Sequence, residues 1–300
     1  MTLLSSIRAF VREFAEPRIS DFILRHNIRL SFPIVLQDDF GIRTILYPWS
    51  SCGILQSKRR EFFKADFELI RQLIKPTDIV FDVGANIGLY TVLMSRLVSD
   101  AGHVYAFEPA PETVRLLDET LALNGCKNVM RVQAAVSDST SQREFFTFEP
   151  KFSEFNSLAY HSMQVKSARV NPGSSVLVPG ETLDTFCEQK AIAHINLLKV
   201  DVEGFEAAVF AGASSLLRNH RIDYILFEIS HEPLSTSGYT ARDVFASLEN
   251  YGYEAHEFDS RGIVNPKSVS DSQEYYRVYL ALAPGVPLPS GSLISPTQSK

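Results

Sequence analysis

The sequence has few cysteines, and no spacing among them suggests a paired set. Cys52, Cys126 and Cys187 are scattered along 300 residues, and none belongs to a C-x-x-C motif. An odd, scattered set fits a reducing compartment better than a disulfide-bonded scaffold. We therefore expect a cytoplasmic protein whose fold depends on its core rather than on disulfide bonds.

Long apolar runs are also missing. No run approaches the roughly 18 residues that a membrane-spanning helix needs. Arg8, Arg12 and Glu13 interrupt the first twenty residues, where a secretory signal would require a continuous apolar stretch. The sequence thus predicts no transmembrane segment and no secretory signal.

An excess of positive charge is the third absence. Lys and Arg number 29 against 35 Asp and Glu, which gives a formal net charge of −6 and a pI near 5.7. Proteins that bind nucleic acids normally present a basic face, so we expect no nucleic-acid partner. The 45% hydrophobic content is ordinary for a globular chain with one sizeable core, which suits a small-molecule ligand.

From about residue 60, compact apolar segments alternate with amphipathic ones. This alternation predicts right-handed strand–helix–strand crossovers, and therefore a doubly wound, Rossmann-like α/β sheet that is mostly parallel. A late segment, Tyr275–Leu282, would add an antiparallel strand. The expected strands are Ile79–Val83, His103–Phe107, Val129–Val136, Ile195–Val200 and Asp223–Ile229, and the expected helices are Phe67–Ile74, Leu89–Leu97, Pro111–Asn124, Phe205–Leu217 and Ala241–Tyr251.

The two ends of the chain differ from this core, which we place at residues 61–283. Residues 1–60 combine a helical apolar stripe from Leu4 to Phe14 with a hairpin pattern around Asp38–Gly41. The helix would dock on the main domain or lie on a membrane surface, and the segment could cap a ligand site, extend a sheet edge or mediate a homodimer. Residues 284–300 contain four prolines and mostly small or polar residues, so we expect a disordered tail.

A glycine-containing loop follows the first expected core strand. Gly84 and Gly88 are four residues apart with Asn86 between them, which differs from the G-x-G-x-x-G pattern of dinucleotide-binding loops. Gly84 would allow a tight turn and close backbone approach. Asp82, at the mouth of the loop, would suit a ligand that carries a positive group.

An acidic residue ends the next expected strand. Glu108 could accept hydrogen bonds from both hydroxyls of a ribose, as acidic residues do at this position in related folds. A nucleoside site without a pyrophosphate cradle favours S-adenosylmethionine as the cofactor. Ala135, near the end of the third expected strand, would line the adenine pocket. The alternative is that Asp82 and Glu108 merely cap helices.

A third acidic motif follows the fourth expected strand. Asp201 and Glu203 are two residues apart, so in an extended backbone they would project to one side. We predict that Asp201 lies beside the methyl donor and that Glu203 orients or deprotonates the acceptor. The alternative is that Asp201 caps the next helix while Glu203 pairs with Lys199.

The fifth expected strand also ends in ionisable residues. His231 is our third catalytic candidate, because histidine is the side chain most often used as a base at neutral pH, although a histidine at this place is more often a surface residue. Asp201, Glu203, Glu228 and His231 together could bind magnesium, but nothing in their spacing requires it, so we predict no metal. The phenylalanine-rich stretch from Phe145 to Phe155 could cover the acceptor pocket.

These motifs carry a resemblance to a known family. Asp82–Gly88, Phe107–Pro109 and Leu198–Glu206 resemble the motifs of FkbM-type methyltransferases. Thr182–Asp184 and Phe227–Ile229 fall where that family has similar motifs. The Lys-x-Asp-x-Glu-Gly segment makes the likeness specific, since many other methyltransferases share the first motif alone.

The resemblance covers about residues 60–282 and implies a seven-stranded methyltransferase sheet. It also implies methyl transfer, typically to a hydroxyl oxygen of a small molecule or saccharide. By matching positions, it implies that Asp82, Gly84, Asn86, Gly88 and Glu108 bind S-adenosylmethionine. The alternatives are an NAD-dependent oxidoreductase, or a binding protein that keeps the cofactor fold without turnover.

Overall fold

The computed structural model describes residues 12–13, 34–38, 40–46, 60–165, 168–272, 274 and 276–289. Most of the predicted N-terminal helical stripe lies outside these residues. Its described part, Arg12–Glu13, is a short strand, β1, rather than a helix. Most of the predicted C-terminal tail also lies outside them. No helix in the described ranges combines the length and apolarity needed to cross a membrane.

The core is one mixed sheet of eight strands, in the order β15-β14-β16-β13-β12-β4-β5-β6. The pairings among β13, β12, β4, β5 and β6 are parallel, and β16 runs antiparallel between β13 and β14. This confirms the doubly wound α/β fold and its antiparallel late strand. The strands are β4 (Ile79–Val83), β5 (His103–Phe107), β6 (Val129–Val132), β12 (Ile195–Val200), β13 (Ile222–Ser230), β14 (Glu254–Phe258), β15 (Val264–Val269) and β16 (Tyr276–Leu282).

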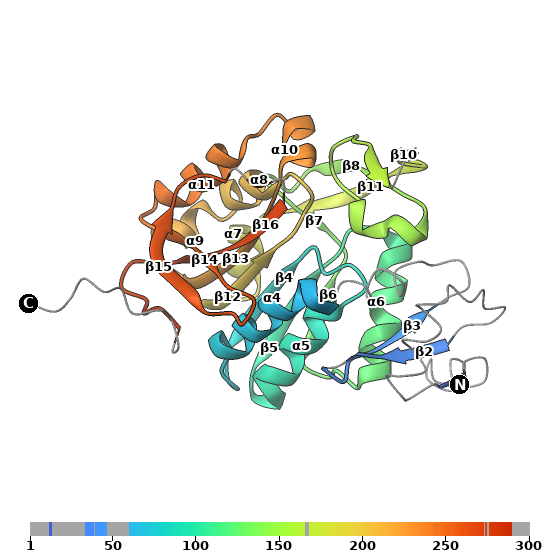
Figure 1. Ribbon diagram of the computed structural model, residues 1–300, viewed down its shortest axis with the longest axis horizontal. Coiled ribbons are helices and arrows are strands. Elements are labelled where there is room, and N and C mark those ends of the chain that lie inside the picture. The colour runs from blue at the N-terminus through green and yellow to red at the C-terminus, as the bar shows by residue number, and fades with distance from the viewer. Residues whose placement is uncertain are drawn as a thin grey trace, which may run out of the picture.

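Helices cover both faces of this sheet, as crossovers between parallel strands require (Figure 1). One face packs against α4 (Arg60–Leu73), α5 (Leu89–Val98) and α6 (Pro111–Asn124). The other packs against α7 (Leu183–Gln189), α8 (Glu206–Ala211), α9 (Ser214–Arg218) and α11 (Ala241–Glu249). A further helix, α10 (His231–Ser237), directly follows β13.

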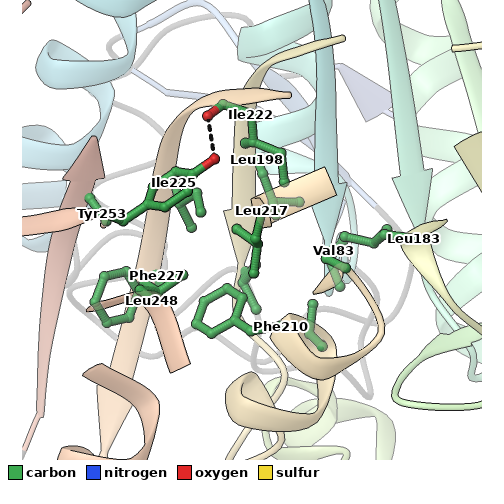
Figure 2. Packing of buried hydrophobic residues seen from close by; sticks show 14 of the residues in the cluster. Val83, Leu183, Leu198, Phe210, Leu217, Ile222, Ile225, Phe227, Leu248 and Tyr253 are labelled. Atoms are coloured by element: carbon green, nitrogen blue, oxygen red, sulfur yellow. Dashed lines mark hydrogen bonds between the residues drawn. The ribbon is translucent and has the colours of Figure 1, made fainter. Parts of the chain in front are cut away.

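Strand alternation decides which residues enter which core. Leu198 and Phe227 face the α7–α11 side, where Figure 2 shows them packed with Phe210 and Leu217. In the same cluster the Tyr253 hydroxyl donates to the backbone carbonyl of Ile222 at 2.8 Å, so its polar end is satisfied. Residues one position along each strand face α4 and α5, and this second face carries the polar groups described below.

Two predicted elements, one strand and one helix, are each divided into two shorter elements in the structure. The strand predicted at Val129–Val136 is β6 plus a separate strand, β7 (Ala135–Val136), which pairs with β11 (Ser174–Glu181). The helix predicted at Phe205–Leu217 breaks into α8 and α9 around Gly212, where an added Cβ would stand 2.0 Å from the carbonyl oxygen of Ser137. Apolar periodicity continues through both breaks, so it could not reveal them.

A smaller sheet of order β7-β11-β8 was not predicted as a unit. β8 (Gln142–Thr147) lies antiparallel to β11 (Figure 1). A 3-10 segment, Pro150–Phe155, follows β8, and the strands β9 (Met163–Val165) and β10 (Ala168–Val170) form a separate pair. This insertion between β6 and α7 reaches the ligand end of the main sheet.

The predicted hairpin is confirmed as β2 (Ile34–Gln37) and β3 (Arg43–Leu46), which pair antiparallel. Arg43 and Asn124 exchange hydrogen bonds, which attaches the hairpin to the C-terminal end of α6 (Figure 1). Since α6 starts after β5, its C-terminal end lies away from the carboxyl ends of the strands. The described hairpin pairs with β1 in a sheet of its own, so it does not extend the main sheet, and its contact with α6 lies at the end away from the site.

Candidate active site

A cavity of about 340 Å³ opens at the carboxyl ends of β4, β5, β12 and β13. The chain runs outward from β4 to β6, then returns to the other side of β4 as β12 and β13, so the sheet reverses direction between β4 and β12. Ligands of open α/β sheets bind at such a reversal. Among the predicted site residues, those lining the cavity are Gly84, Asn86, Gly88, Glu108, Ala135, Asp201 and Glu203.

The glycine loop is shaped by contacts within the protein. Gly84 has φ +84°, and a Cβ added there would lie 1.7 Å from the carbonyl oxygen of Asp201. Gly88 has φ +92°, and its added Cβ would lie 2.5 Å from the Cδ1 atom of Leu117. The predicted tight turn and close approach are both present, but the backbone that approaches Gly84 belongs to the chain itself.

Glu108 connects the loop after β4 to the loop after β5 through hydrogen bonds to backbone N–H groups. Its Oε2 accepts from the backbone N–H of Asn86 at 3.1 Å, and its Oε1 accepts from that of Ala110 at 3.0 Å. Ala110 is the N-cap residue of α6, and that helix start has no side-chain cap hydrogen bond, so Glu108 does not cap the helix as the alternative required. A carboxylate offers about four acceptor positions, which leaves room for hydroxyls from a ligand. Burial raises the pKa of Glu108 to about 7, against the lowering effect of these two hydrogen bonds.

Asp82 does not reach the cavity wall. It is fully buried, and its Oδ2 accepts a hydrogen bond from the Thr91 hydroxyl at 2.5 Å. Its Oδ1 lies 3.7 Å from Lys199 Nζ and has no hydrogen-bond partner among the described residues. Burial raises the pKa of Asp82. Asp82 is therefore separated from the cavity, next to Lys199, and its buried side chain has no exposed surface for the predicted contact with a ligand.

Lys199 lies among the polar side chains on the sheet face that packs against α4 and α5, and it is only 4% exposed. Its Nζ donates to Asp201 Oδ2 at 3.0 Å and lies 4.4 Å from the centre of the Tyr90 ring. Burial opposes its charge, but Asp201 and Asp82 outweigh that effect and its pKa is raised. The alternative prediction that Lys199 forms an ion pair with Glu203 is wrong, because the Lys199 ammonium group lies beside Asp201 and Asp82.

Glu203 reaches the cavity by a different route from the one expected. Its φ of +51° is left-handed rather than extended, and Gly204 follows at φ +95°. The buried Ser157 hydroxyl donates to the Glu203 carbonyl oxygen at 2.8 Å and ties this turn to the insertion. Asp201 caps no helix, since α8 begins after Phe205 without a side-chain cap. The turn nevertheless brings both acidic side chains to the cavity.

His231 is not among the residues that line the cavity. It is the first residue of α10, and its buried Nε2 has no hydrogen-bond partner among the described residues. Its catalytic role therefore stays a prediction without support from its position.

Several cavity residues were not predicted. Phe63 of α4 and Tyr90 of α5 cover the α4–α5 side of the opening, and Tyr276 of β16 borders it. The Tyr90 hydroxyl donates to the buried Asp66 carboxylate at 2.6 Å, and burial raises the pKa of Asp66 to about 7. No local motif marks these residues, because they meet only through helix and strand packing.

The acidic groups of the site are close together. One carboxylate oxygen each from Asp201, Glu203 and Glu228 lies within 4.8 Å of the other two. Such a set could hold a divalent cation by its distances alone. His231 does not belong to it, and Lys199 already compensates Asp201. The absence of a metal requirement stays a prediction.

The fold and the cavity define a doubly wound α/β protein with a cavity at the reversal of the sheet. Residues 82–255 match the family model described as the methyltransferase FkbM domain. That match covers more than half of the chain, and the chain belongs to this family.

Curated relatives agree with the family. The chain is 26% identical over 170 residues to the hexuronic acid methyltransferase AglP of Haloferax volcanii, covering 55% of this chain and 63% of the relative. It is 31% identical over 160 residues to the 31-O-demethyl-FK506 methyltransferase FkbM of Streptomyces tacrolimicus, covering 46% and 60%. The chain thus spans about three fifths of the length of each relative.

Among solved structures, the chain is similar to the methyltransferase FkbM of Methylobacillus flagellatus. The sequence identity is 13%, the TM-score is 0.42, and the match covers 88% of this chain and 58% of the other. At that TM-score the likeness adds nothing to the fold described above.

Proposed function

We propose that the chain is an S-adenosylmethionine-dependent methyltransferase that methylates a hydroxyl group of a small molecule or saccharide. One observation carries the proposal: a single cavity at the sheet reversal is lined by the glycine loop, Glu108 and the pair Asp201 and Glu203. Four of the five sequence motifs contribute residues to the lining of this cavity, and Thr182–Asp184 does not.

The residues present fit S-adenosylmethionine. Glu108 lines the cavity and has acceptor positions beyond its two hydrogen bonds, which would suit ribose hydroxyls, and Ala135, also in the lining, would lie beside the adenine. The loop from Gly84 to Gly88 presents backbone and Asn86 rather than a phosphate cradle. When bound, the cofactor would supply a methyl group on a positively charged sulfonium, which suits an acidic cavity.

The chain's own part in the reaction is to position the reactants and manage a proton. Asp201, held by Lys199, would lie beside the reacting centre, and Glu203 would orient the acceptor hydroxyl. Holding two reactants at near-attack distance supplies much of the rate increase in such transfers. The Ser157 contact to the Glu203 carbonyl would keep that side chain at the wall.

The names of the two relatives support the choice of acceptor. One is a hexuronic acid methyltransferase and the other acts on a 31-O-demethyl compound, which point to saccharide and hydroxyl acceptors respectively. An NAD-dependent oxidoreductase is disfavoured, because the loop lacks the glycine spacing for a pyrophosphate. A cytoplasmic location and a homodimer remain predictions from the sequence.

Calorimetric titration with S-adenosylmethionine, S-adenosylhomocysteine and NAD tests the proposal. We expect micromolar-range binding of both adenosyl ligands, none of NAD, and a large loss of affinity in Glu108→Gln. The matched control is Glu112→Gln, an exposed glutamate in the first turn of α6. Binding of NAD alone, or of none of the three, would overturn the proposal.

A further inference from the structure

The reaction proposed above releases a proton from the acceptor, and the structure offers a carboxylate that the sequence motifs did not assign to this task. We propose that Glu228 is the general base that takes this proton, and that Tyr276 positions it. This inference rests on the proposed function.

Strand geometry brings Glu228 and Tyr276 together. Glu228 and Ser230 share the sheet face of Leu226, which packs under α4 and α5. Ser230 lies opposite Tyr276 and Glu228 lies opposite Val278 in the antiparallel β13–β16 pair, so Glu228 and Tyr276 are diagonal neighbours on one face. The Tyr276 hydroxyl donates to the Glu228 carboxylate, and both side chains line the cavity.

The position of Glu228 along the sheet suits an acceptor rather than a cofactor. Glu108 follows β5, and β13 lies three strands away in the order β13-β12-β4-β5. At about 4.8 Å per strand this is roughly 14 Å. A cofactor whose ribose lies at Glu108 and whose reacting end lies near Asp201 leaves the region beyond β12 for the acceptor. Glu228 lies on a sheet strand in that region, within 4.8 Å of the Glu203 carboxylate.

The other carboxylates nearby are less suited to the task. Asp201 Oδ2 is already engaged by Lys199, and Glu203 is placed by a loop turn rather than by the sheet. Glu228 is held in a strand, is only 9% exposed, and is oriented by a hydroxyl from the neighbouring strand. A base fixed by rigid elements keeps its geometry better than one on a loop.

The surroundings of Glu228 also favour its taking a proton. Burial raises its pKa well above the usual value, the negative charges of Asp201 and Glu203 raise it further, and the Tyr276 hydrogen bond lowers it. Glu206 at the start of α8 adds to the negative charge, and Lys199 of β12 is the positive group that faces it. A carboxylate whose pKa is raised binds a proton more strongly than an ordinary one does.

The step balances without a further reactant. The acceptor oxygen forms its bond to the methyl carbon as the carbon–sulfur bond breaks, and the electron pair of that bond stays on sulfur. The hydroxyl proton passes to the Glu228 carboxylate and leaves to water after the product departs.

The first test needs no acceptor. Infrared difference titration of the free protein follows the carboxylic-acid carbonyl band as pH rises. We expect a band that titrates well above the normal glutamate range and is missing in Glu228→Gln, while the exposed control Glu254→Gln keeps it. Identical titrations in wild type and Glu228→Gln would overturn the proposal. In Tyr276→Phe we expect this band to titrate at higher pH, because the hydrogen bond that stabilises the carboxylate is lost.

The second test uses turnover, with methyl glycosides as probe acceptors and S-adenosylhomocysteine formation as the readout. We expect Glu228→Gln to lower kcat about 10²–10⁴-fold, the usual contribution of a general base. Its affinity for S-adenosylmethionine should match that of wild type. If Glu228→Gln turned over within about threefold of wild type, the role of Glu228 as the base would be overturned. If wild type itself did not bind S-adenosylmethionine, the proposed function would be overturned instead.

Discussion

Gly84 and Asp201 touch through their backbones: a Cβ placed on Gly84 would lie 1.7 Å from the Asp201 carbonyl oxygen. The contact joins the glycine loop after β4 to the acidic loop after β12. The Asp201 N–H also donates to the Val83 carbonyl oxygen at 3.0 Å. The two motifs that define the family are therefore one structural unit.

Replacing Gly84 with alanine should break this unit. The left-handed backbone costs a residue with a Cβ about 1–3 kcal/mol, and the clash with fixed backbone adds a similar amount. We expect Gly84→Ala to lower the free energy of unfolding by roughly 2–5 kcal/mol in urea denaturation. Gly125→Ala is the control, since Gly125 also has positive φ but its added Cβ would meet nothing within 4 Å. Equal losses in the two variants would show that the Asp201 contact is unimportant.

The buried Asp66 should make stability depend on pH. Its pKa is raised from 3.8 to about 7, chiefly by burial, so between these values the folded state binds more protons than the unfolded state. Its contribution is therefore fully present below about pH 4 and is lost as pH rises through 7. The shift corresponds to roughly 4 kcal/mol at most.

Asp66→Asn removes this titration while keeping an acceptor for Tyr90. We expect the variant to gain stability relative to wild type as pH rises from about 4 to above 7, measured by urea unfolding at both ends. Asp100→Asn, at an exposed aspartate, should show no such trend. A constant difference between Asp66→Asn and wild type across this range would show that Asp66 does not titrate there.

Much of the fold could be predicted from the sequence because the central strands β4, β5 and β12 are short, apolar and followed by a helix. Ile79–Val83, His103–Phe107 and Ile195–Val200 were predicted with their observed ends. The insertion holding β8 and β11 was missed as a sheet, because its strands have mixed burial and pair across a long connection.

The site could be predicted only where a motif ends a strand. Glu108 and Asp201 follow strand ends directly and reach the cavity. Asp82 belongs to β4 itself, so its side chain enters the sheet face under α5. Tyr90 and Tyr276 reach the site from a helix and from the last strand, and their place depends on strand order, which a single sequence does not specify.

Chelation should leave turnover unchanged. Asp201, Glu203 and Glu228 lie close enough to share a cation, but Lys199 already supplies positive charge to Asp201. We expect methyl transfer to proceed at the same rate after dialysis against EDTA, measured by S-adenosylhomocysteine formation. Loss of activity that Mg²⁺ restores would instead identify these carboxylates as metal ligands.

Asp201→Asn should reduce turnover more than it reduces binding of the cofactor. The asparagine keeps the size of the side chain but removes the charge that pairs with Lys199 at 3.0 Å, leaving that buried ammonium with Asp82 alone. A buried charge that loses one partner disturbs its surroundings strongly. We therefore expect kcat to fall at least about tenfold, with a smaller change in calorimetric affinity for S-adenosylmethionine.

The comparison variant is Asp118→Asn, whose partner Arg131 lies at the surface and whose kcat should match that of wild type. Full turnover in Asp201→Asn would remove Asp201 from the reacting centre and leave Lys199 with a purely structural part.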